Sequence, residues 1–207
     1  MISNFTVIEG NIGSGKTTLV KKLAKEFSAQ LILEEFEENP FLSEFLSDQK
    51  TNSLGVELQF LMDRFHQLKK TDQTAKITFA DYFIEKSLIF SANNLSKIEK
   101  DLFDNYFKAL FSTIKRPNLL IYLSVSSERL LKNIKLRGRE IEEHINSNYL
   151  NKIHNSYLSY FEKIKENTKI LIIETSLIDF VKNENDYTRI KEIILKEHPI
   201  GITNVKF

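Results

Sequence analysis

The chain has 207 residues, 42% hydrophobic and 28% charged residues, a formal net charge of +1 and no cysteine. A chain of this length can bury one good core, so we expect a single domain over residues 1–207. The balanced charge argues against nucleic acid or a membrane surface as a partner, the missing cysteines exclude disulfides and thiolate chemistry, and the absence of a membrane-span or signal-peptide pattern predicts a cytoplasmic protein.

Hydrophobic spacing predicts strands that alternate with helices along the whole chain. In chain order we expect a strand at 4–10, a helix at 17–27, a strand at 29–36, a helix at 53–70, a strand at 75–82, helical stretches near 84–92 and 96–114, a strand at 118–125, helices at 127–136 and about 142–165, a strand at 168–174 and a helix at 185–197. The alternation predicts a three-layer α/β/α fold around a five-stranded parallel sheet.

The first strand and helix are joined by GNIGSGKT (10–17), which matches the pattern G-x-x-x-x-G-K-[ST]. Its glycines let backbone N–H groups turn toward phosphate, and the helix that follows adds its positive dipole end. Lys16 would neutralise the β- and γ-phosphates, and Thr17 Oγ1 is a natural Mg²⁺ ligand. A glycine-rich turn without a ligand would need both spacing and context to be accidental. We therefore predict a site for ATP and Mg²⁺ at Gly10, Asn11, Ile12, Gly13, Ser14, Gly15, Lys16, Thr17 and Thr18.

The phosphate acceptor has to be identified from the rest of the chain. The guanine motif N-K-x-D and the switch motif D-x-x-G of GTPases are both missing. The strand in LILEEF (31–36) ends at Glu34, which places this carboxylate at the rim of the sheet, where it could accept the proton of an attacking hydroxyl. The alternative is a solvated acidic loop formed by Glu34, Glu35, Glu37 and Glu38.

A second feature is KLRGRE (135–140), in which Arg137 and Arg139 flank a glycine at a predicted helix end. Two arginines held in this way can form a mobile clamp, or lid, for phosphoryl charge. The alternative is an ordinary basic turn. A phosphate-binding loop and an arginine lid in one chain support each other, and together they favour a small-molecule kinase of the P-loop fold.

The sequence resembles the deoxynucleoside kinases, in their bacterial deoxyadenosine/deoxyguanosine-kinase-like branch, over most of its length. The matching segments are IEGNIGSGKTTL (8–19), LEEFEENPFL (33–42), ELQFLMDRFHQLK (57–69), DYFIEKSLIFSANNL (81–95) and RGREIEEHINSNYL (137–150). The resemblance implies that Glu34 is the general base for the substrate 5′-hydroxyl. It also implies that Arg137 and Arg139 clamp the transferred phosphoryl group, beside the catalytic Lys16.

The resemblance implies further contacts with substrate and nucleotide. Glu142 matches a lid acid that holds the deoxyribose 3′-hydroxyl, and Arg64 matches a helix arginine near the base. Asp179 and Phe180 resemble the loop that cups the adenine of ATP, although an ordinary turn beside a core phenylalanine is an equal alternative. Glu57 and Arg64 are seven residues apart, so they face the same side of one helix and could frame a flat ligand. The alternative is an exposed acid and an exposed base.

Three positions depart from the family pattern. Glu57 stands where many relatives have a glutamine that reads the base, and an ionised carboxylate only accepts hydrogen bonds. We therefore expect Glu57 to favour bases that present N–H donors, such as the amine of adenine. The motif [DE]-R-S is replaced at 80–82, where Asp81 could still serve Mg²⁺ but the arginine is missing. Leu46 lies near the position of a tyrosine that contacts the 3′-hydroxyl, so sugar recognition should depend more on Glu142.

Together with the resemblance, the sequence predicts an enzyme, an ATP-dependent deoxynucleoside kinase with a purine substrate, and favours deoxyadenosine. One alternative is a nucleoside monophosphate kinase of the thymidylate type. That alternative is weakened because ITFADYFIEKS (77–87) lacks an arginine for the acceptor's own phosphate. Another is a regulatory module that binds nucleotide without catalysis, which the missing arginine of [DE]-R-S would favour. The resemblance also implies a homodimer.

Overall fold

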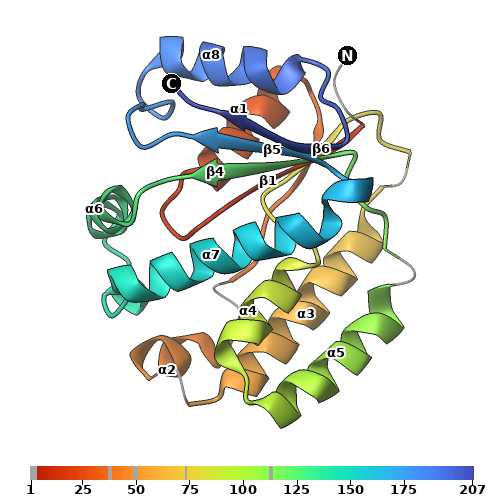
Figure 1. Ribbon diagram of the computed structural model, residues 1–207, viewed down its shortest axis with the longest axis vertical. Coiled ribbons are helices and arrows are strands. Elements are labelled where there is room, and N and C mark those ends of the chain that lie inside the picture. Colours follow the sequence, from red (N-terminus) through yellow and green to blue (C-terminus); the bar gives the residue numbers. More distant parts are fainter. Residues whose placement is uncertain (1–3, 37–38, 49–50, 73, 112–113) are drawn as a thin grey trace.

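The computed structural model describes residues 4–36, 39–48, 51–72, 74–111 and 114–207 (Figure 1). The strands are β1 (Phe5–Gly10), β2 (Gln30–Ile32), β3 (Thr78–Ala80), β4 (Leu119–Ser124), β5 (Lys169–Glu174) and β6 (Gly201–Val205). The helices are α1 (Lys16–Glu26), α2 (Leu42–Ser47), α3 (Ser53–Lys70), α4 (Lys86–Asn94), α5 (Lys97–Phe111), α6 (Ser127–Arg137), α7 (Ser147–Ile164) and α8 (Glu184–Leu195), with 3₁₀ turns η1 (Glu140–Glu142) and η2 (Lys165–Asn167).

The described strands form one parallel sheet in the order β2-β3-β1-β4-β5-β6. Helices α1 and α8 cover one face, and α7 with α3, α4 and α5 covers the other (Figure 1). The predicted three-layer α/β/α fold is confirmed. The predicted strand count of five is wrong, because β6 adds a sixth strand that pairs with β5 at one edge. Its sequence, GITNV, carries too few apolar residues to stand out as a strand.

Burial of the central strands on both faces explains their unbroken apolar sequences. Val7 belongs to the core on the α7 side and Ile8 to the core on the α1 side, and neither side chain is exposed. Leu120 and Ile121 of β4 divide in the same way, because successive side chains of a strand point to opposite faces. The chain therefore buries two apolar layers on a single sheet.

Local capping sets the helix ends around the lid segment, which is the stretch 138–146 between α6 and α7. The α6 helix starts after Ser126, whose hydroxyl accepts a hydrogen bond from the N–H of Arg129. It ends at Gly138, which has φ 64°, a left-handed conformation that glycine adopts without strain. The helix expected from about residue 142 starts only at Ser147, because the side chain of Asn146 caps it there.

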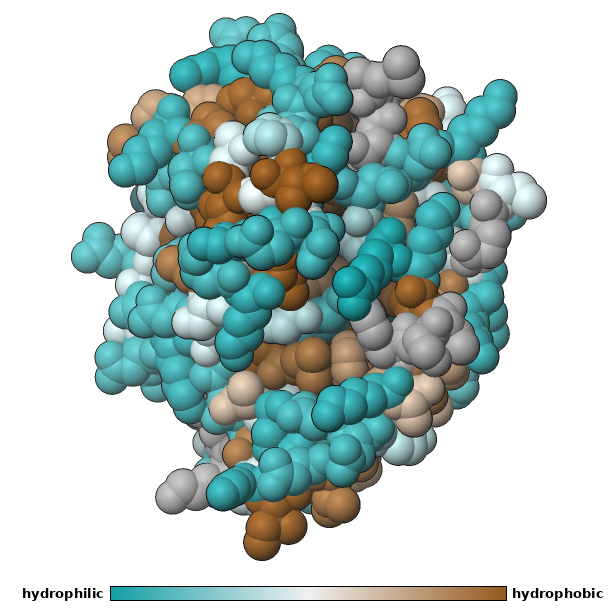
Figure 2. All heavy atoms as spheres, turned by 45° about the vertical axis from the view of Figure 1, so that its right-hand side comes forward, coloured by the Kyte–Doolittle hydropathy of each residue, from teal (hydrophilic) through white to brown (hydrophobic). Residues whose placement is uncertain are grey.

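The surface in Figure 2 is mostly hydrophilic and carries several separate apolar patches, one of them at its lower end, where α5 begins in Figure 1. Among the exposed apolar residues are Ile98, Leu102 and Tyr106, which follow one another at four-residue intervals along α5. Within the part of the chain that the structure describes, no helix combines the length and apolar character that crossing a membrane requires.

Candidate active site

A cavity of about 600 Å³ opens beyond the carboxyl ends of β1, β2 and β3. This is the edge at which open parallel sheets bind ligands. Its walls come from the loop after β1, the segment after β2, helices α3 and α4, and the lid segment between α6 and α7. Its lining includes most of the predicted site: Lys16, Thr17, Thr18, Glu34, Glu57, Arg64, Asp81, Arg137, Arg139 and Glu142.

The loop between β1 and α1 has the shape of a phosphate cradle. Gly13 and Gly15 have φ of 84° and 87°, in the left-handed region that other residues adopt only with strain. At Gly10 a Cβ would stand 2.5 Å from the hydroxyl oxygen of Ser14, so only glycine lets the loop close this tightly. The side chain of Asn11 anchors the loop by donating to the carbonyl of Leu150 at 2.8 Å. The loop therefore turns into α1 at Lys16, as the pattern predicted.

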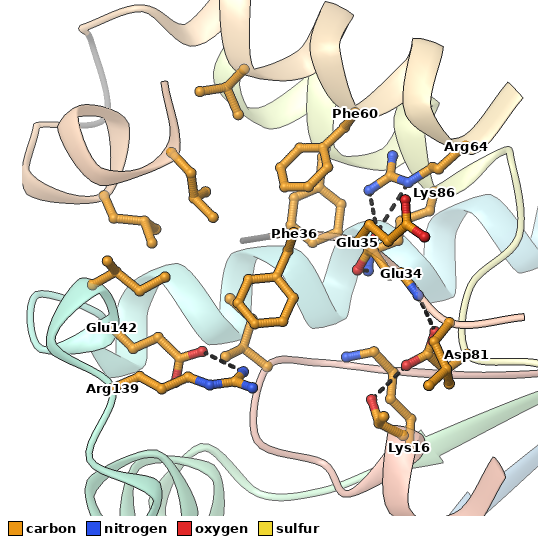
Figure 3. Close-up of a pocket in the computed structure, with 18 of the residues that line it drawn as sticks. Lys16, Glu34, Glu35, Phe36, Phe60, Arg64, Asp81, Lys86, Arg139 and Glu142 are labelled. Carbon is orange, nitrogen blue, oxygen red and sulfur yellow. Dashed lines mark hydrogen bonds and ion pairs between the residues drawn. The ribbon is translucent and has the colours of Figure 1, made fainter. Parts of the chain in front are cut away.

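The carboxylate of Glu34 is the centre of a charged cluster (Figure 3). Its Oε1 accepts from Nε and Nη2 of Arg64 at 3.0 and 2.5 Å, and its Oε2 accepts from Nζ of Lys86 at 2.5 Å. Its backbone N–H donates to Oδ1 of Asp81 at 2.8 Å. Burial alone would raise the pKa of Glu34, but Lys86 and Arg64 outweigh it and hold the pKa well below its usual range. The carboxylate therefore stays ionised.

The alternative of a solvated acidic loop is wrong for Glu34, whose side chain is only 13% exposed. Strand β2 ends at Ile32, before Glu34 and short of the strand predicted at 29–36, so that the chain leaves the sheet and carries Glu34 into the cavity. Glu35 is exposed and accepts a hydrogen bond from Gln67. Glu37 and Glu38 lie outside the described residues.

Lys86 is a site residue that the sequence reasoning missed. The expected cation was an arginine directly after the third strand, whereas the structure supplies a lysine from the start of α4. Its side chain is 6% exposed and lines the same cavity as Lys16. The available signal was that Lys86 is the one basic residue between positions 81 and 96. The departure from the family motif therefore does not leave Glu34 short of a second cation.

Thr17 and Asp81 meet beside Lys16. The hydroxyl of Thr17 donates to Oδ2 of Asp81 at 2.5 Å, and Asp81 is buried. Mg²⁺ prefers oxygen ligands and usually takes one or two from protein, completing its shell with water and substrate phosphate. Among the described residues no three His, Cys, Asp or Glu side chains cluster around a possible metal. A hydroxyl and a carboxylate beside a phosphate cradle fit Mg²⁺ that arrives with a nucleotide.

Burial lowers the pKa of Lys16, and the charge of Lys86 lowers it further. The carboxylates of Glu9, Glu34 and Asp81 act in the opposite direction. Burial and the charge of Lys86 thus disfavour the charged form of Lys16, and a polyanionic ligand bound beside it would oppose both effects.

Glu57 and Arg64 line the cavity as expected, and the alternative of an exposed acid and base is wrong, because both are buried. The guanidinium of Arg64, however, already has protein partners. It binds Glu34 and also donates to the hydroxyl of Ser87 at 2.7 Å. Glu57 accepts at Oε1 from the side chain of Asn94 at 2.7 Å. The two residues thus bind different partners in the same cavity.

The two lid arginines, Arg137 and Arg139, both pair with the carboxylate of Glu142. Glu142 accepts at Oε2 from Nε of Arg137 at 3.1 Å and pairs with Nη2 of the same side chain, while Nη1 of Arg139 lies 3.5 Å from Oε1. The guanidinium of Arg139 also lies over the ring of Phe36, 4.4 Å from its centroid (Figure 3). Both arginines therefore reach the cavity but bind Glu142 rather than the Glu34 cluster.

Asp179 and Phe180 lie behind the phosphate-binding loop, outside the cavity lining. The ring of Phe180 packs on Gly15, where its Cζ would be 2.8 Å from an added Cβ. Oδ1 of Asp179 accepts from the N–H groups of Val181 and Lys182 at 3.2 and 3.1 Å. Asp179 is thus a turn residue and Phe180 a buried ring beside the cradle. This position is compatible with a loop that cups the adenine of ATP and also with an ordinary turn beside a core phenylalanine.

Comparison with known proteins agrees with this geometry. The family model for deoxynucleoside kinase matches residues 6–198. The chain is 33% identical to the deoxyguanosine kinase of Bacillus subtilis, over 92% of this chain and 98% of that protein. It is 31% identical to the deoxyadenosine kinase of Lactobacillus acidophilus, over 94% and 97% respectively. A solved structure of deoxyadenosine kinase from M. mycoides with bound dATP shares the fold, with a TM-score of 0.78 at 20% identity over 92% of this chain and 99% of that one.

Proposed function

The chain belongs to the deoxynucleoside kinase family and is a phosphotransferase, and we propose that it transfers the γ-phosphoryl group of ATP to the 5′-hydroxyl of a purine deoxynucleoside. The observation that carries this proposal is the position of Glu34, a buried and ionised carboxylate in the same cavity as Lys16 of the phosphate cradle. A hydroxyl bound beside Glu34 would meet the terminal phosphate of a nucleotide bound at the loop. The names of the relatives, deoxyguanosine and deoxyadenosine kinases, support a purine substrate.

The donor would be held by the loop between β1 and α1. Backbone N–H groups of residues 10–17 and the start of α1 would bind the phosphates, with Lys16 between the β and γ positions. Thr17 and Asp81 would hold Mg²⁺, which when bound neutralises charge on the phosphates. Phe180, packed on Gly15, supports a position for the adenine of ATP near the segment that begins at Asp179.

Glu34 would accept the proton of the 5′-hydroxyl as the new O–P bond forms and the bond to the leaving ADP breaks. A carboxylate with a depressed pKa is a weak base, but phosphoryl transfer passes through a loose transition state in which the hydroxyl loses its proton late. Placement and a permanent negative charge therefore matter more than basicity. Arg64 and Lys86 secure both properties of Glu34, because their ion pairs fix the position of its carboxylate and keep it ionised.

The lid arginines would change partner when phosphate is bound. In the structure Arg137 and Arg139 are both paired with Glu142, so their charge is already held at the rim of the cavity. A triphosphate would compete for them and leave Glu142 free to accept a hydrogen bond from the sugar 3′-hydroxyl. Leu46 lines the cavity with an apolar side chain, which supports a larger share for Glu142 in sugar recognition.

The ion pair of Lys86 with Glu34 gives a testable result. Lys86→Met should lower kcat about 10²-fold, because it removes one of two cations that hold the catalytic carboxylate. Lys86→Arg keeps the charge and should retain more of the activity. Steady-state kinetics with a saturating deoxynucleoside would measure both. A kcat for Lys86→Met equal to that of the unmodified chain would exclude this role for Lys86.

A screen of the four deoxynucleosides with Mg²⁺–ATP tests the proposed function directly. We expect ADP release that depends on a purine deoxynucleoside and yields its 5′-monophosphate. Deoxynucleoside monophosphates serve as the comparison, because phosphorylation of these alone would identify a monophosphate kinase. Binding of ATP without turnover of any acceptor would indicate a regulatory module.

The homodimer implied by the resemblance remains a prediction. The apolar side chains of Ile98, Leu102 and Tyr106 support it, since they are exposed on one side of α5 and a second copy of the chain would cover them. Light scattering would give the mass in solution, and Leu102→Glu should shift that mass from two chains to one. A monomeric mass for the unmodified chain would contradict the prediction.

A further inference from the structure

Glu57 has a carboxylate oxygen without a partner. Its Oε2 is buried and has no hydrogen-bond partner, while Oε1 accepts from Asn94. The side chain is 2% exposed, and it lines the cavity rather than the packed core. A buried acceptor left unmatched is unfavourable, so its position at a cavity wall suggests that a ligand completes it.

The surroundings of Glu57 suit a flat heterocycle. Phe60 of α3, Phe90 of α4 and Tyr149 of α7 line the same cavity with aromatic rings. Rings of this kind provide stacking surfaces for a base, while a polar group at its edge provides discrimination. Within the proposed function, the base of the deoxynucleoside would therefore bring its hydrogen-bonding edge to Glu57.

The charged and titratable groups that act on Glu57 come from several elements around the cavity. They are Arg64 on α3, Lys86 on α4, Glu34 after β2 and Tyr149 on α7, with the neutral amide of Asn94 on α4. The two cations are already bound to Glu34. Burial keeps Tyr149 neutral by raising the pKa of its phenol well above the usual range. Glu57 is therefore the group in this part of the cavity whose own charge is open to change.

The two purines make opposite demands on a carboxyl group. Guanine presents two donors side by side, N1–H and the 2-amino group, which suit an acceptor-only carboxylate. Adenine presents one donor, the 6-amino group, beside the acceptor N1. An ionised carboxylate would repel that N1, whereas a protonated carboxyl group offers a donor and an acceptor together.

We propose that Glu57 sets the purine preference of this kinase through its protonation state, with the ionised side chain selecting deoxyguanosine and the protonated side chain admitting deoxyadenosine. This inference rests on the proposed function. It also replaces the expectation that an ionised Glu57 favours the amine of adenine, because deoxyadenosine is then expected only for the protonated form. An amide at this position has no such dependence, because it presents a donor and an acceptor at every pH and matches either purine by rotating.

The surroundings of Glu57 set the pH at which its carboxyl group gains or loses a proton. Burial raises the pKa of Glu57 to about 7, against the opposing effects of the hydrogen bond from Asn94 and the charges of Arg64 and Lys86. Below this pH the protonated form predominates and above it the ionised form does. The preference should therefore move toward deoxyguanosine as the pH rises.

The test is the ratio of kcat/KM for deoxyadenosine to that for deoxyguanosine, measured from about pH 6 to about pH 8.5. Effects of pH on ATP binding and on the chemical step act on both substrates and cancel in the ratio. If each purine requires one form of Glu57, the ratio falls about tenfold for each pH unit. Glu57→Gln should give a ratio that does not change with pH. Asn94→Ala removes the bond that favours the ionised form, so it should raise the ratio at every pH.

Several results would overturn the inference. A constant ratio in the unmodified chain would do so, as would an equal fall in Glu57→Gln, which would assign the effect to another group. If no deoxynucleoside is phosphorylated, the proposed function fails, and the inference is then decided by calorimetry. The ratio of dissociation constants for the two nucleosides should change with pH in the same direction, and a constant ratio would disprove the role of Glu57.

Discussion

Replacing Lys16 by alanine should abolish phosphoryl transfer, lowering kcat/KM by at least about 10³-fold. Lys16 is the first residue of α1, and it enters the cavity from the loop that would bind the phosphates. In the proposed mechanism its positive charge has two roles. It binds the triphosphate, and it stabilises the negative charge that moves to the leaving ADP. Alanine removes both interactions.

Lys25→Ala is the matched control for Lys16→Ala. It lies in the last turn of the same helix with its side chain exposed, and it does not line the cavity. The control should retain the activity of the unmodified chain. Circular dichroism and the Tm of both variants would show that the fold is kept. A Lys16→Ala variant with more than about a tenth of normal kcat/KM would contradict the proposed binding of phosphate at this loop.

Replacing Glu34 by glutamine should lower kcat about 10²-fold or more and leave the affinity for ATP unchanged. An amide cannot take the proton of the 5′-hydroxyl, and its NH₂ group would face Arg64 and Lys86 in place of an anion. ATP would bind at the loop after β1, away from these contacts, so its affinity should be preserved. Steady-state kcat and calorimetric titration with ATP measure the two effects separately.

The loss of two ion pairs could also weaken the fold, so Glu34→Gln needs a control of similar burial. Glu85→Gln provides it, because Glu85 is a buried glutamate just before α4 that does not line the cavity. This variant should keep normal kcat. Near-normal kcat in Glu34→Gln would remove Glu34 from the reaction. Equal losses in both variants would attribute the effect to packing near α4 instead of proton transfer.

Features encoded by neighbouring residues could be predicted from the sequence. The phosphate cradle, the helix Ser53–Lys70 and the α/β alternation follow from local patterns, because glycine conformation, helical periodicity and strand hydrophobicity each depend on a short stretch of chain. The strand predicted at 118–125 is an unbroken apolar run, and its side chains divide between the cores on the two faces of the sheet. The family resemblance, too, rested on contiguous segments.

Features that depend on distant residues were missed or misplaced. The short helix Leu42–Ser47 and the edge strand Gly201–Val205 lack strong periodicity and depend on packing against the rest of the fold. The ion pair of Arg64 with Glu34 was not predicted, because the two residues come from different elements. Lys86 replaces the absent arginine from a different position along the chain.

The residues proposed to bind phosphate and to take the proton, Lys16 and Glu34, were evident in the chain itself, because each belongs to a short pattern with its own chemistry. Their pairing was a matter of tertiary structure. Which cation neutralises Glu34, and which oxygen of Glu57 is left for a ligand, follows from how β2, α3 and α4 converge on one cavity. Charge and hydrogen bonding act through space over a few ångströms, and sequence separation does not measure that distance.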